Sequence, residues 1–245
     1  TATMLVRRKQ RTAAPAIRRA VCMAIHVKQT EEAEDDIEDV LQPFFNDQIE
    51  SAARSLRGQG MPSGNEEQAA AKLADRIFKS EDWDVKLVDS TLPSLVIAQG
   101  RAAMAELTAA GFDPTDDTRS TTATEWLQSQ DDVDLEDVVF ATPQGDVSMR
   151  IATEWPDWMK QSIKDNMATT FEQPYWAKVN QTTHGDIGNF IKRGLLNGES
   201  IATIAGNMES ELHETGIYAR RRARTIARTE SGNVLNAGRK SSTDQ

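Results

Sequence analysis

The C-terminal segment from Tyr218 to Arg239 constrains the fold most strongly, because its small and apolar residues recur at helical spacing. Three arginines, Arg220, Arg224 and Arg228, lie four residues apart on a neighbouring face. Glu230 falls on the apolar stripe, where a carboxylate is costly unless an arginine or backbone donors satisfy it. The segment therefore predicts one amphipathic helix with an internal acid–guanidinium contact. Its apolar stripe consists of Ala219, Ala223, Ile226, Ala227, Val234 and Ala237.

Helical signals also dominate the N-terminal half of the chain. We expect residues 1–12 to form a basic arm and residues 13–29 a short helix, with Thr30 as the N-cap of the next helix. Pro43 should kink that helix or mark a new start, because proline lacks the N–H group. Pro93 fits the first turn of a later helix.

The C-terminal half is expected to contain several shorter helices. Pro156 should open one helix and Pro174 should end it, with the next helix starting near Thr183. Residues 197–198 (Asn-Gly) fit a helix stop, and Ser200 fits the N-cap of a short helix.

One pair of β-branched segments, residues 138–142 and 146–151, flanks a turn and predicts a hairpin. The expected fold is mainly α: an elongated multi-helix assembly with one small β-hairpin. We expect four regions: a basic N-terminal arm and short helix (1–30), a helical region (31–112), an acidic segment with the hairpin (113–152), and a helical region ending in the Arg-rich helix (153–245).

Charge is distributed in blocks. The chain of 245 residues carries a formal net charge of −10, which opposes non-specific attraction to nucleic acid. Residues 1–30 nevertheless hold seven Lys or Arg and no acid, whereas residues 31–50 hold nine acids and no base. Residues 113–146 hold ten acids and one base. Such blocks fit either contacts with oppositely charged neighbours or solvated helix faces.

Two ordered motifs resemble a known family. The string Arg224-Thr-Ile-Ala-Arg-Thr-Glu230, followed by Asn233 and Asn236, resembles the signature of the phage Mu F-like minor head proteins, the phage head morphogenesis family. Residues 182–205, read as a helix, a Gly-containing turn and then Ser-Ile-x-x-Ile-Ala, are similar to a second block of that family. The similarity covers residues 155–240. Members of that family usually continue past the Arg-Thr-Glu helix into a C-terminal domain, which we do not expect within residues 1–245.

The resemblance implies a non-enzymatic structural protein of the virion head, present in host cytoplasm during assembly. It implies multiple copies, partners among the portal and major capsid proteins, and a role in head assembly or DNA packaging and delivery. A membrane or small-molecule partner is not expected. Thr229, Glu230, Asn233 and Asn236, with Arg224 and Arg228, are the residues that the family motif covers.

Two alternatives remain open. The chain could be a nucleic-acid-binding module that contacts packaged double-stranded DNA, or the C-terminal part of a portal fusion. Trp155 and Trp158 could pack inside or anchor a partner, since exposed aromatic residues dominate interface energetics. The arginines of the last helix could pair internally, meet an acidic partner or contact phosphates. The proposed partner or DNA contacts are Arg7, Arg8, Lys9, Arg11, Arg220, Arg221, Trp155 and Trp158.

The sequence offers no catalytic constellation, so we expect neither an enzyme nor a cofactor. His26, His184 and His213 are far apart and predict no zinc site. The acids at 132, 134, 136 and 137 lack the glycine that a calcium loop requires. Cys22 is the one cysteine, so no internal disulfide can form.

Overall fold

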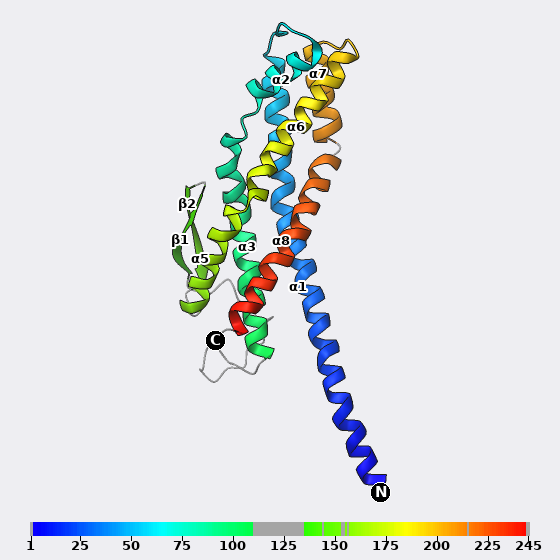
Figure 1. Cartoon of the computed structure of the whole chain (residues 1–245), viewed down its shortest axis with the longest axis vertical. Coiled ribbons are helices and arrows are strands. Elements are labelled where there is room, and N and C mark those ends of the chain that lie inside the picture. Colours follow the sequence, from blue (N-terminus) through cyan, green and yellow to red (C-terminus); the bar gives the residue numbers. More distant parts are fainter. Residues whose placement is uncertain are drawn as a thin grey trace.

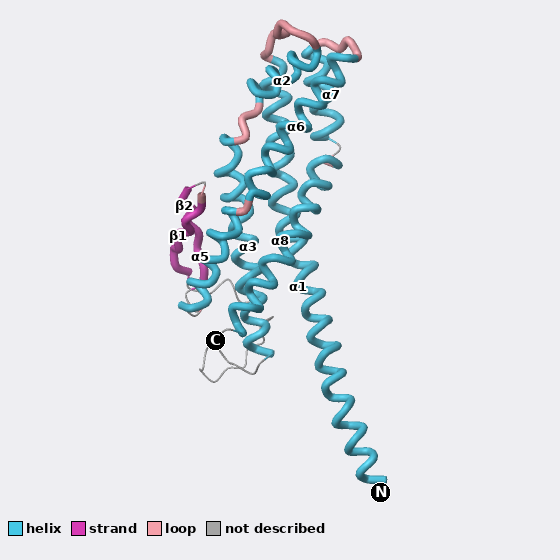
Figure 2. Tube along the Cα trace, in the orientation of Figure 1, coloured by secondary structure: helices cyan, strands magenta, loops and turns pink. Residues whose placement is uncertain are grey.

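The protein is a mainly helical, elongated molecule in which long helices run side by side (Figures 1 and 2). The computed structural model describes residues 2–109, 135–143, 145–152, 155, 157–214 and 216–243. Within them, the expected mainly-α class with one hairpin is confirmed. The elements are α1 (Ala2–Arg57), α2 (Glu66–Ile77), α3 (Glu81–Ala109), β1 (Leu135–Thr142), β2 (Gly145–Ala152), α5 (Asp157–Glu172), α6 (Pro174–Leu196), α7 (Ile201–Met208), the π-helix η2 (Glu209–Glu214) and α8 (Ile217–Thr243).

Helix α1 is one continuous helix, so the predictions of a separate basic arm, a short helix over 13–29 and an N-cap at Thr30 were wrong. No glycine interrupts residues 2–57, and buried residues recur at helical spacing from Ala33 to Leu56. Thr30 is compatible with a helix interior when nothing else stops the helix. The region boundary expected at residue 30 therefore falls inside α1, and the N-terminal half of α1 projects beyond the bundle (Figure 1).

Two prolines, Pro43 and Pro93, do not begin new helices. Pro43 lies within α1 and Pro93 within α3, rather than in the first turn of a helix. Buried neighbours hold α1 together there, since Leu41 and Phe45 are fully buried. Pro174 does follow the end of α5, but it also begins α6 at once, so the expected start near Thr183 was wrong.

The core consists of two apolar clusters along the length of the bundle. One joins the middle of α1 to α3, α5, α8 and the hairpin, and the other joins the end of α1 to α2, α6 and α7. Trp83 packs against both clusters. Helix α8 lies against α1 and α3, which makes the Arg-rich segment part of the structural centre.

The predicted hairpin is confirmed. Strands β1 and β2 pair in antiparallel register with Phe140 opposite Val147. Val138, Phe140 and Ile151 are buried, whereas Val139 is exposed, as alternation in a half-buried strand requires. The buried face packs on α5 and α3, which gives this two-stranded ribbon the support that it lacks alone.

The predicted stop and cap between α6 and α7 are also confirmed. Asn197 is the C-cap of α6, and Gly198 follows with φ of 74°, a conformation that glycine adopts without a steric penalty. The Ser200 hydroxyl accepts a hydrogen bond from the Thr203 amide at 3.1 Å and starts α7. The π-helix η2 continues α7 and was not predicted.

Candidate interaction site around helix α8

The apolar stripe predicted for the Arg-rich helix is largely buried. Ala219, Ala223, Ala227 and Val234 are at most 1% exposed. The small side chains of this stripe let α8 lie close to α1 and α3. The arginines on the other faces of α8 lie in three different environments.

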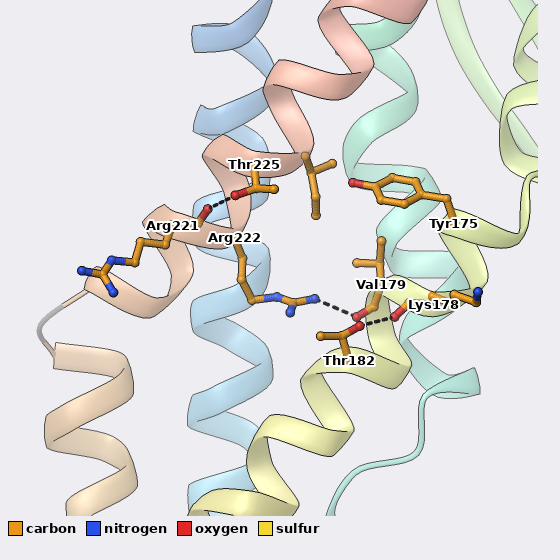
Figure 3. A pocket seen from close by; sticks show the side chains of 8 residues that line it. Tyr175, Lys178, Val179, Thr182, Arg221, Arg222 and Thr225 are labelled. Carbon is orange, nitrogen blue, oxygen red and sulfur yellow. Dashed lines mark hydrogen bonds between the residues drawn. The ribbon is translucent and has the colours of Figure 1, made fainter.

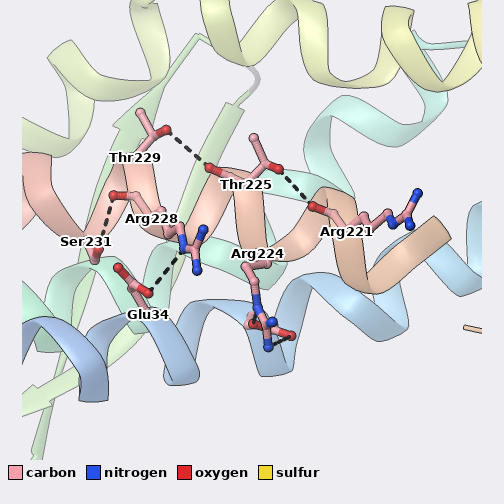
Figure 4. A network of polar contacts seen from close by, with 8 residues as sticks. Glu34, Arg221, Arg224, Thr225, Arg228, Thr229 and Ser231 are labelled. Carbon is pink, nitrogen blue, oxygen red and sulfur yellow. Dashed lines mark hydrogen bonds and ion pairs between the residues drawn. The ribbon is translucent and has the colours of Figure 1, made fainter. Parts of the chain in front are cut away.

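Two arginines of the predicted face pair with acids of α1. The Nε and Nη2 atoms of Arg224 donate to the two carboxylate oxygens of Glu38 at 3.0 and 3.4 Å. Arg228 Nε lies 3.7 Å from Glu34 Oε2. Figure 4 shows both arginines directed from α8 toward α1. The arginine side chains are more than half exposed, so each pair contributes modestly to stability.

Arg222 forms the inner contact of the helix, although the sequence analysis did not single it out. Its Nη2 donates to the Val179 carbonyl at 2.8 Å, and its Nη1 lies 3.4 Å from Asp186 Oδ2. The guanidinium also lies over the Phe45 ring, 4.8 Å from its centroid. The Tyr218 hydroxyl donates to the same Asp186 carboxylate at 2.9 Å. The sequence signal for a buried Arg222 was its position, because it lies four residues after Tyr218 and four residues before Ile226, on the same face of the helix.

Arg220 and Arg221 are exposed and have no ion pair with any residue that the structure describes. Figure 3 shows the Arg221 side chain extending away from the other labelled side chains. The basic positions of the expected N-terminal arm, residues 7, 8, 9 and 11, lie on helix α1, and their side chains are outside the described part of the structure.

Glu230 is buried as predicted, at 1% exposure, but no arginine contacts it. Its Oε2 accepts a long hydrogen bond of 3.4 Å from Asn233 Nδ2, and its Oε1 has no hydrogen-bond partner. Burial raises the pKa of this carboxyl above its usual value, and the Asn233 hydrogen bond opposes the change. The predicted acid–guanidinium contact of Glu230 was therefore wrong, because Arg224 and Arg228 pair with acids of α1 instead.

A second titratable group lies near Glu230. Burial raises the pKa of the Tyr175 hydroxyl to about 12, and the Glu230 charge acts in the same direction. In both groups burial disfavours the charged form of the side chain.

The remaining motif residues bond locally on α8. The Thr229 hydroxyl donates to the Thr225 carbonyl at 3.2 Å. Asn236 Oδ1 accepts from Arg239 Nη1 at 3.5 Å, at the outer limit of a hydrogen bond. These contacts stabilise the helix surface and do not converge on a ligand.

The tryptophans predicted as packing or anchoring residues pack inside. Trp155 is 6% exposed, and its ring lies so close to Gly100 that a Cβ atom there would lie 2.3 Å from it. Trp158 is partly buried against the same cluster. Trp176 is buried beside Phe171, with ring centroids 4.9 Å apart. An exposed anchoring role is excluded for Trp155.

A cavity of about 460 Å³ lies between α6 and α8 (Figure 3). Three of its polar side chains are already engaged: the Thr182 and Thr225 hydroxyls donate to carbonyls of their own helices at 2.8 Å, and Arg222 binds Val179 and Asp186. The cavity therefore presents mainly apolar surface. It is lined by Tyr175, Lys178, Val179, Thr182, Arg221, Arg222, Thr225 and Ile226.

Metal-binding predictions are only partly covered by the structure. Among the described residues, no group of three or more His, Cys, Asp or Glu side chains could hold a metal ion. Residues 132 and 134 of the weak calcium-loop pattern lie outside the described residues, as do the side chains of His26 and His213. His184 lies 3.0 Å from Asp75 on the surface. No helix in the described ranges is long and apolar enough to cross a membrane.

Comparisons with protein-family models, with curated proteins and with solved structures gave no match to this chain. The functional proposal therefore rests on the geometry of the residues and on the two sequence motifs.

Proposed function

We propose that this chain is a non-enzymatic structural protein of a bacteriophage head, bound to the portal or to the inner capsid and acting in head assembly or DNA delivery. The resemblance of two motif blocks to the phage Mu F-like minor head proteins is the basis of the proposal. The first block, residues 182–205, corresponds to the end of α6, the turn at Gly198 and the Ser200-capped α7. The second, residues 224–236, lies in the middle of α8.

The observation that supports this proposal best is the link between the two blocks. Asp186, in the first block, accepts hydrogen bonds from Arg222 and Tyr218, which lie on α8, the helix that carries the second block. The two ordered motifs thus belong to one structural unit. If the two blocks resembled the family only by chance, there would be no reason to expect the segments that carry them to be in contact.

The environment of α8 favours a structural role for the Arg-Thr-Glu string. Arg224 and Arg228 bind acids of α1, and Glu230 is buried without a charged partner. The two arginines link α8 to α1, which is a structural use of the motif.

Mass spectrometry of purified particles tests the proposal. The chain should be found in proheads and mature virions of the phage that encodes it, in several copies per particle. A matched sample from a phage with a nonsense mutation in this gene should lack it and should contain fewer filled heads. Absence of the chain from both proheads and virions would falsify the proposal.

A second candidate function, contact with packaged DNA, rests on the projecting half of α1. Residues 1–30 hold seven Lys or Arg and no acid, and Arg220 and Arg221 are exposed elsewhere on the molecule. Duplex DNA should then bind more weakly as salt rises, and each lost phosphate contact should reduce the slope of log K against log salt by about one. No binding at low salt would dismiss this candidate.

A further inference from the structure

The strongest unassigned feature is the cavity between α6 and α8 (Figure 3). Its volume of about 460 Å³ falls within the range of roughly 300–1,000 Å³ that is usual for small-molecule sites. Such sites are mostly apolar, carry a few polar groups that orient the ligand, and often lie between the helices of a bundle. The size and place of this cavity therefore fit a ligand site.

The floor of the cavity is apolar. Val179 on α6 and Ile226 on α8 are buried and line it. Figure 3 shows the Tyr175 ring reaching from α6 toward α8 at one end, and the Tyr175 hydroxyl has no hydrogen bond with any described residue. An apolar ligand placed on this floor leaves water, and each methylene group buried in this way tightens binding about threefold to fourfold.

The rim of the cavity is positively charged. Of the eight lining residues, three are Lys or Arg and none is Asp or Glu, in a chain whose formal net charge is −10. Lys178 on α6 and Arg221 on α8 are exposed, and neither has an ion pair with any residue that the structure describes. Figure 3 shows their side chains extending to opposite sides of the cavity. Because no described carboxylate holds them there, both can turn toward an anion at the mouth.

The third cation, Arg222, is fixed beside the cavity. Its Nη2 donates to the Val179 carbonyl, and its Nη1 lies 3.4 Å from Asp186 Oδ2. Asp186 also accepts a hydrogen bond from the Tyr218 hydroxyl. The acid nearest the cavity is therefore engaged by its own neighbours, and the two rim cations remain available to a ligand.

We propose that this cavity binds an amphipathic anion, a small molecule with an apolar body and one carboxylate. The body lies on the floor of Val179 and Ile226, against the Tyr175 ring. The carboxylate lies at the mouth between Lys178 and Arg221, so that one ligand links α6 to α8. A nucleic-acid backbone would use the charged rim but leave the apolar floor unfilled, so the lining favours the amphipathic anion.

This inference departs from the expectation that no small molecule binds, and it is independent of the proposed phage function. Its test uses the full chain and the fluorescent aromatic anion anilinonaphthalene sulfonate (ANS), whose emission rises in apolar surroundings. Decanoate should displace ANS at low salt. Decanol, which has the same chain without the charge, should need a concentration about threefold to tenfold higher. Octanoate, which is two methylene groups shorter, should bind about tenfold more weakly than decanoate.

Single substitutions assign the binding to this cavity. Lys178→Gln and Arg221→Gln should each weaken decanoate binding about twofold to fivefold, as the loss of an exposed ion pair does, and leave decanol binding unchanged. The matched control is Arg76→Gln, which removes an exposed cation on α2 outside the lining and should change neither ligand.

A second pair of variants tests the cavity itself. Thr182→Trp places a large ring at the exposed rim and should abolish binding of both decanoate and decanol. Gln181→Trp adds the same ring at the neighbouring exposed position, which does not line the cavity, and should leave both affinities unchanged. Circular dichroism and a thermal scan verify that each variant is folded.

Four results would overturn the proposal. The first is a wild-type chain from which decanoate displaces no ANS, and the second is equal displacement by decanol and decanoate, which would remove the role of the rim charges. The third is unchanged decanoate binding in Thr182→Trp, which would place the ligand elsewhere. The fourth is displacement of ANS by a short DNA duplex but not by decanoate, which would assign Lys178 and Arg221 to phosphate groups.

Discussion

The contact between α3 and α8 depends on Gly238. A Cβ atom at this position would lie 2.4 Å from the Gln99 carbonyl oxygen and 2.9 Å from the Ala102 Cβ atom. Ordinary contacts begin near 3.4 Å, so Gly238→Ala forces the two helices apart by about 1 Å. The obstacle at Gln99 is backbone, which cannot move aside as a flexible side chain could.

The expected cost follows from two opposing terms. Overpacking of this size destabilises by about 1–3 kcal/mol, and replacing glycine by alanine in a helix stabilises by up to about 1 kcal/mol. Gly232 is a matched control on the same helix, because nothing lies within 4 Å of a Cβ atom placed there. Gly232→Ala should therefore stabilise the protein. Both variants share the helix-propensity term, so the difference between them isolates the steric term of about 1–3 kcal/mol.

Urea unfolding followed by circular dichroism at 222 nm measures that difference for both variants. A thermal scan should give the same order, with a shift of about 2–4 °C per kcal/mol for a chain of this size. Equal stability of Gly238→Ala and Gly232→Ala would refute the close approach of α3 and α8.

Three further predictions concern the polar contacts of α8. Glu230→Gln should raise the melting temperature at pH 8 and change it little near pH 4, as melting scans across pH would measure. The reason is that the pKa of Glu230 is higher in the folded than in the unfolded protein. The wild type therefore keeps its full stability below the unfolded-state pKa and loses stability as the pH rises through the folded-state pKa. A pH-independent difference between Glu230→Gln and wild type would contradict this. Arg222→Lys should lower the free energy of unfolding in urea by about 1–3 kcal/mol, because lysine cannot donate to both Val179 and Asp186 as the guanidinium does; Arg221→Lys, its exposed neighbour, should change it by less than about 0.5 kcal/mol. A double-mutant cycle with Arg224→Ala and Glu38→Ala should give a coupling of about 0.2–1 kcal/mol that disappears in 1 M NaCl, and a salt-resistant coupling would contradict the exposed geometry.

Local signals predicted the elements that local chemistry determines. The cap at Ser200, the stop at Gly198 and the alternation of the hairpin depend on backbone donors and left-handed conformations within a few residues. The apolar stripe of α8 follows from helical periodicity alone. These features were therefore readable from the sequence.

Features that depend on distant residues were not readable. Pro43 remains helical because buried neighbours in α1 pack on other helices, and Pro174 begins a helix in the turn where it was expected only to end one. Glu230 was correctly placed on the buried face, but its environment comes from the neighbouring elements and contains no arginine. Arg222 was missed because its acceptors, Val179 and Asp186, lie about 40 residues earlier.

The central claim, a structural role in a phage head, is tested most directly by a reconstruction of the particle. The account predicts density for the α1, α3 and α8 bundle on the portal vertex or the inner capsid surface, in several symmetry-related copies. A particle of the phage that encodes this chain, reconstructed without such density at either place, would contradict it.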